Sequence, residues 1–123
     1  YPMREADGFR LDVDDYVRFI HDRGSRSLPL PPNDPDGGYV FRDRIVRMLD
    51  DLVVVVVESF IAFVDAGPVC SVADEAAIRH NVVVLGSLGN TFCLHGVRFG
   101  YMVANPAIPE RIARAYRSGT STP

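Results

Sequence analysis

Residues 53–57 read Val53-Val54-Val55-Val56-Val57, directly after Leu52. β-Branched residues favour strands, and a run of them without polar alternation indicates a strand covered on both faces, as in a parallel sheet flanked by helices. Residues 82–85 repeat the pattern as Val-Val-Val-Leu. We therefore predict an α/β fold, a three-layer sandwich in which helices flank a mostly parallel sheet.

Two amphipathic helices are predicted before the valine run. Asp12 is the expected N-cap of the first, and Arg42, Arg44 and Arg47 are expected on solvated faces of the second. The apolar positions at helical spacing are Val13, Tyr16, Val17 and Ile20 in the first helix and Ile45, Met48, Leu49 and Leu52 in the second.

The segment between these helices is rich in turn-forming residues. Residues 24–27 interrupt the helical pattern, and Leu28-Pro29-Leu30 leads into the run PPNDPDGG at residues 31–38. Proline and glycine at this density favour turns. We therefore interpret residues 28–38 as a loop and not as a strand.

Further elements are predicted after the valine run. Ser71 and Asp74 have the spacing of a capping box, which predicts a short helix ending near His80. Residues 99–104 are a strand candidate, and Asn105 is the expected N-cap of a last helix. The residues of that helix expected to face inward are Ile108, Ile112 and Tyr116.

The composition excludes one class of chemistry. All 13 basic residues are arginines, so the 123-residue chain contains no lysine. Mechanisms in which a lysine amine forms a Schiff base, clamps a phosphate or acts as a general base are therefore excluded for this polypeptide alone. The length corresponds to one domain. The net charge of -3, without a strongly basic half, predicts no nucleic-acid partner.

The apolar runs and the cysteines bear on location. Residues 52–57 are the longest apolar run, far shorter than the roughly 20 residues of a membrane-spanning helix, so we expect no membrane insertion. Cys70 and Cys93 are not part of a Cys/His cluster. They predict two buried thiols in a reducing, cytoplasmic compartment and no metal site.

Four segments have the order and approximate spacing of motifs in a known family. They read YPMREADGFR at residues 1–10, PPNDPDG at 31–37, VESF at 57–60 and SLGNTFCLHGVRFGY at 87–101. The last resembles the cofactor-lysine segment of fold-type I pyridoxal-phosphate aminotransferases, especially the histidinol-phosphate aminotransferase and threonine-phosphate decarboxylase branch. The second and third resemble that family's NPNNPTG loop and its DEAY or DESF motif.

This resemblance implies a domain boundary and a cofactor. Residues 1–117 would be a partial large domain of the aminotransferase fold, and residues 118–123 a disordered tail. The implied cofactor is pyridoxal phosphate, bound without a covalent bond at best.

The resemblance also assigns site positions, most of which carry substitutions. Ser87 and Arg98 match the residues that hold the cofactor phosphate, three positions before and eight after the lysine, which is replaced by Asn90. Val57 matches the aspartate that pairs with the pyridine nitrogen. Asp34 and Phe60 match the asparagine and tyrosine that hydrogen-bond to the phenolate oxygen of the ring.

These substitutions lead us to expect no catalytic residue and no activity. The family's reaction would be amino-group transfer from an amino acid or its phosphate ester to a 2-oxo acid. Glu58, a lone carboxylate after a buried strand, is interpreted as structural, and His95 as a packing residue.

Two alternatives remain open at the level of the sequence. The chain could be an assembly module that pairs with itself as a homodimer or with an active homologue. It could also bind a phosphorylated small molecule weakly through Ser87 and Arg98. The competing interpretation is that Arg98 pairs with a nearby carboxylate and Ser87 merely ends a strand.

Overall fold

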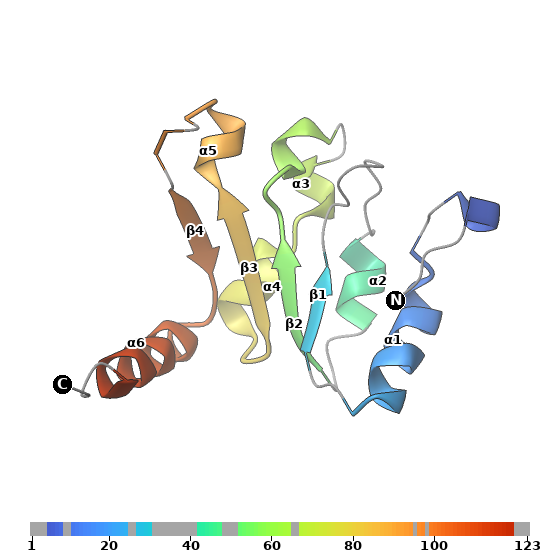
Figure 1. The fold of residues 1–123 in the computed structure, drawn as a ribbon, viewed down its shortest axis with the longest axis horizontal. Coiled ribbons are helices and arrows are strands. Elements are labelled where there is room, and N and C mark those ends of the chain that lie inside the picture. The colour runs from blue at the N-terminus through green and yellow to red at the C-terminus, as the bar shows by residue number, and fades with distance from the viewer. Residues whose placement is uncertain are drawn as a thin grey trace.

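The chain folds around a four-stranded sheet (Figure 1). A computed structural model describes residues 5–8, 11–24, 27–30, 42–47, 52–64, 67–94, 96–97 and 99–119. The strands are β1 (Ser27–Leu30), β2 (Val53–Val57), β3 (Val82–Ser87) and β4 (Gly100–Val103). The helices are α1 (Val13–Asp22), α2 (Arg42–Arg47), α3 (Gly67–Cys70), α4 (Ala73–Ile78), α5 (Leu88–Thr91) and α6 (Ala107–Gly119), with short 3-10 turns η1 (Glu5–Asp7) and η2 (Ile61–Phe63).

The sheet is mixed but mostly parallel. Its strand order is β1-β2-β3-β4, with β1, β2 and β3 parallel and β4 antiparallel to β3. The register pairs Val54 with Val82 and Val84 with Val103. The predicted α/β class, with a mostly parallel sheet flanked by helices, is therefore confirmed.

The apolar core lies on one face of this sheet. Its strand residues are Val54, Val56, Val82 and Val84, and helices α1, α2 and α4 contribute Val13, Ile20, Ile45 and Ala76. Alternate residues of β2 point to the opposite face, where Val53 is 47% exposed. Coverage of that second face is thus incomplete in the described part of the chain.

Residues 27–30 form β1, so the interpretation of residues 28–30 as a loop is wrong. β1 runs parallel to β2, with Pro29 opposite Val55. Proline lacks a backbone N–H, but β1 is an end strand of the described sheet, where one side of the backbone needs no partner. The rest of that predicted loop, residues 31–38, lies outside the described residues.

Helix α1 is confirmed with its predicted cap. The Asp12 carboxylate accepts a hydrogen bond from the N–H of Asp15 at 3.0 Å. The helix ends where Gly24 adopts a positive φ of 66° and its N–H donates to the carbonyl of His21 at 2.9 Å. Glycine adopts this left-handed conformation without the steric penalty of a Cβ.

Helix α2 is shorter than its apolar pattern predicted. Ile45 lies in the core, as expected. Leu52 is also buried but lies after the described helix, immediately before β2. Met48 and Leu49 lie outside the described residues.

The prediction of solvated arginines is wrong for Arg42. Its guanidinium donates to the carboxylates of Asp74 and Glu75, the latter at 3.0 Å, and to the Ser71 carbonyl at 2.9 Å. An arginine can do this because its planar fork of donors serves several acceptors at once. Arg42 therefore connects α2 to the start of α4.

The predicted short helix is confirmed as α4, which ends at Ile78, but its predicted capping box is wrong. Val72 holds the N-cap position without a side-chain bond. The Ser71 hydroxyl accepts a hydrogen bond from the N–H of Ala73 at 3.2 Å and donates to Glu58, while the Asp74 carboxylate pairs with Arg42. The spacing of Ser71 and Asp74 does not reveal the long-range partners Glu58 and Arg42.

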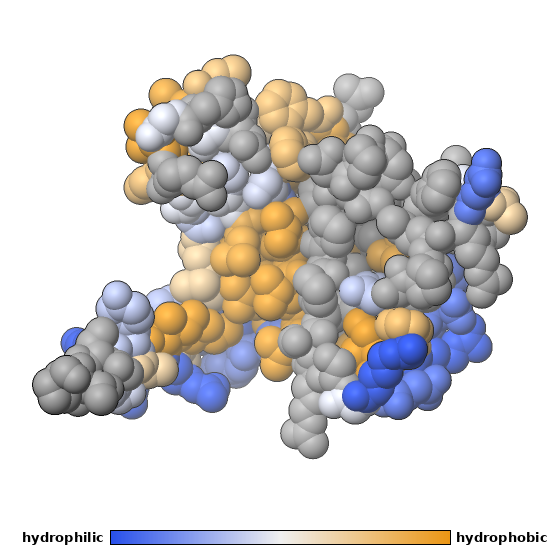
Figure 2. Space-filling view, viewed as in Figure 1, coloured by the Kyte–Doolittle hydropathy of each residue, from blue (hydrophilic) through white to orange (hydrophobic). Residues whose placement is uncertain are grey.

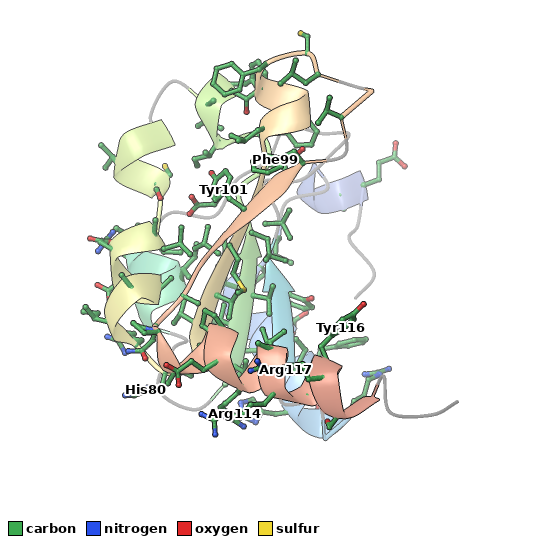
Figure 3. The ribbon with its side chains drawn as sticks, turned by 90° about the vertical axis from the view of Figure 1, so that its left-hand side faces the viewer. His80, Phe99, Tyr101, Arg114, Tyr116 and Arg117 are labelled. Carbon is green, nitrogen blue, oxygen red and sulfur yellow. The ribbon has the colours of Figure 1, made fainter. Side chains whose placement is uncertain are left out.

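The last strand and helix are confirmed, but the orientation predicted for α6 is wrong at two of its three inward positions. The Asn105 side chain accepts a hydrogen bond from the N–H of Ala107 at 3.1 Å, as an N-cap does. Ile108 is half-buried, whereas Ile112 and Tyr116 are exposed, and Tyr116 projects from the helix (Figure 3). Helix α6 continues to Gly119, and residues 120–123 lie outside the described residues.

One of the two cysteines departs from prediction. Cys70 is buried, as expected, whereas Cys93 is exposed. Cys93 has a positive φ of 54° in the turn after α5. Within the described part of the chain, no helix combines the length and apolar character needed to cross a membrane.

Candidate functional site

Two of the predicted site positions lie at the carboxyl ends of neighbouring parallel strands. Val57 is the last residue of β2 and Ser87 the last of β3, and Val57 is paired in register with Leu85. Leu85 and Ser87 are two positions apart on one strand, so these three side chains lie on one face of the sheet. Open α/β sheets bind ligands beyond this edge, which makes it the candidate site.

The backbone at the end of β3 turns directly into α5. Ser87 is half-buried, and its carbonyl accepts a hydrogen bond from the hydroxyl of Thr91 at 3.3 Å. The Leu88 N–H donates to the carbonyl of Phe99 at 3.2 Å, which ties the start of α5 to the segment before β4. These bonds fix the backbone at the start of α5, the helix that contains Asn90.

Several predicted site residues lie wholly or partly outside the described part of the chain. The backbone of Asn90 lies in α5, but its side chain is outside the described part of the chain. Asp34, His95 and Arg98 lie outside it entirely. The pairing of Ser87 with Arg98 around a phosphate therefore stays a prediction.

The side chains described at the end of β2 are apolar. Val57 is half-buried, and Phe60 is exposed with its ring centroid 6.4 Å from that of Phe63. Neither side chain has a polar atom with which to bind a ring nitrogen or a phenolate oxygen.

The carboxylate next to Val57 is already engaged. Glu58 is 5% exposed and accepts hydrogen bonds from the Ser71 hydroxyl and the Val72 N–H, both at 2.8 Å. Its own N–H donates to the carbonyl of Leu85 at 2.7 Å. These contacts agree with the structural role expected for Glu58, because they hold the entry to α4 against the end of β2.

A second arrangement at this edge was missed by the sequence analysis. Tyr101 of β4 lies opposite Gly86 of β3, and a Cβ on Gly86 would overlap the tyrosine ring (Figure 3). A glycine inside a strand often marks such a close approach. Gly86 was the available signal, because it interrupts an apolar strand one position before Ser87.

The charged network beside the site serves the fold. The Arg42 guanidinium holds the pKa of the exposed Asp74 carboxyl below its ordinary value, chiefly through their hydrogen bond. Glu75 also accepts a hydrogen bond from Arg79 at 2.8 Å. These contacts join α2 to α4.

The comparisons with known proteins agree with this architecture. The family described as "Aminotransferase class I and II" matches residues 1–123. The chain belongs to the class I and II aminotransferase family. A histidinol-phosphate aminotransferase from Shewanella oneidensis is 41% identical to it over 86 residues, 68% of this chain and 21% of that protein.

Solved structures support the same family. A decarboxylase from Sulfurospirillum multivorans has a TM-score of 0.78 and 27% identity, covering 94% of this chain and 35% of its own. A histidinol-phosphate aminotransferase from Sinorhizobium meliloti, solved with pyridoxal 5'-phosphate, has the same fold, with a TM-score of 0.74 and 17% identity over 85% of this chain and 30% of its own. The chain spans less than a third of the length of curated relatives that it matches.

Pyridoxal phosphate is the cofactor of this family, but the residues of this chain do not fit it. Val57 offers no charge to a protonated ring nitrogen, and Glu58 is engaged by Ser71 and Val72. The sequence has no lysine to anchor the cofactor covalently.

Proposed function

We propose that this chain is a non-catalytic aminotransferase-like domain that keeps the fold of its relatives and has lost their covalent chemistry. The absence of lysine from the whole sequence carries the proposal. Asn90 stands at the lysine position, and an amide nitrogen is neither a usable nucleophile nor a base at neutral pH.

The surroundings of Val57 support the same conclusion. In the family reaction the ring serves as an electron sink while its nitrogen is protonated and paired with a carboxylate. A valine at that position would leave a buried charge without a partner, which is strongly unfavourable. Restoring one residue would therefore not restore the reaction.

Chemical trapping tests this proposal. We expect the pure chain, mixed with pyridoxal phosphate and reduced with borohydride, to carry no phosphopyridoxyl group at any internal residue in peptide mass mapping. Label at the terminal amine of Tyr1 is disregarded, and Asn90→Lys is the positive control because it supplies an ε-amine. An internal adduct on the unmodified chain would contradict the proposal.

A second candidate function, an assembly role, is favoured by the apolar side chains exposed on the sheet. Monomeric soluble proteins rarely expose large contiguous apolar patches, and such patches mark interaction sites. A homodimer or a pair with an active homologue would both cover apolar surface. Light scattering of the purified chain separates a monomer from a homodimer, and light scattering after mixing with an active homologue tests the mixed pair.

Weak binding of a phosphorylated small molecule stays a prediction based on Ser87 and Arg98. It is tested by titrating pyridoxal phosphate and inorganic phosphate into the chain and into Arg98→Ala. Weak binding that the substitution removes would support it, whereas equal binding by both proteins would show that Arg98 is not involved.

A further inference from the structure

No further inference is drawn: the strongest candidate, the apolar patch that Val53, Leu85 and Met102 expose on the sheet face opposite the core (Figure 2), carries nothing, because nothing in the described part of the chain shows what covers it.

Discussion

At the scale of single residues, Val57 and Glu58 show how neighbouring positions in the same motif have separate roles. Val57, which the family resemblance matches to an aspartate, lies on the sheet face opposite the core, and Glu58 is buried on the core side against Ser71 and Val72. The carboxylate that remains therefore stabilises the fold and is not available to a ligand.

Removing this carboxylate should destabilise the chain. Glu58→Ala leaves the Val72 N–H buried without an acceptor, which costs about 1–3 kcal/mol of unfolding free energy. Glu58→Gln keeps one acceptor oxygen and should cost less. Urea denaturation measures both, with the exposed Glu110→Gln as control. Equal stability of Glu58→Ala and the unmodified chain would contradict this role.

Gly86 and Tyr101 form a pair whose coupling can be measured. Gly86→Ala should destabilise the chain by about 1–3 kcal/mol, because the new methyl group overlaps the tyrosine ring. In a Tyr101→Ala background the same substitution should cost much less. A double-mutant cycle in urea tests this, and additive effects would show that the ring does not restrict position 86.

At the scale of elements, Arg42 links α2 to α4 through a partly exposed ion pair. Pairing lowers the folded-state pKa of Asp74 below its ordinary value of 3.8. A carboxylate with a depressed pKa stabilises the fold fully above its unfolded-state pKa, and this stabilisation is lost as the pH falls through the folded-state pKa.

The pair therefore predicts a specific pH dependence. The difference in unfolding free energy between the unmodified chain and Asp74→Asn should be constant from about pH 5 to pH 8 and shrink below about pH 4. In an Arg42→Gln background this dependence should be weaker, since the principal cause of the depressed pKa is gone. Denaturation curves across this pH range measure it, and a difference that grows on acidification would contradict the assignment.

Local patterns predicted those elements whose causes are local. The valine runs became β2 and β3, and Asp12 and Asn105 cap α1 and α6 as expected. The predictions were wrong where contacts with residues far away in the sequence determine the local structure. Strand β1 forms despite Pro29 because β2 lies beside it. Ser71 donates to Glu58 across 13 positions instead of forming a capping box with Asp74.

The candidate site was likewise predicted from the sequence only in part. The two buried strands were predicted from their valine runs, whereas their adjacency, which brings Val57 and Ser87 to one edge, comes from the sheet pairing. The ring of Tyr101 over Gly86 likewise depends on the antiparallel register of β4. No spacing within the sequence reveals that register.

At the scale of the whole molecule, the sheet exposes apolar side chains on the face opposite the core, among them Leu85 and Met102. We expect the chain to bind a hydrophobic dye such as ANS in its folded state, because Leu85 and Met102 are partly exposed. The double substitution Leu85→Gln and Met102→Gln should reduce dye fluorescence more than Phe63→Gln, an exposed residue of η2. Equal reductions would show that the sheet face opposite the core is not the main apolar surface.

The central claim is that the aminotransferase fold persists here without its chemistry. The most direct measurement is the conversion of amino acids and their phosphate esters to the corresponding 2-oxo acids or decarboxylated amines by the pure chain with added pyridoxal phosphate. We predict no conversion above that of free pyridoxal phosphate. Turnover above that background, retained through further purification, would contradict the account.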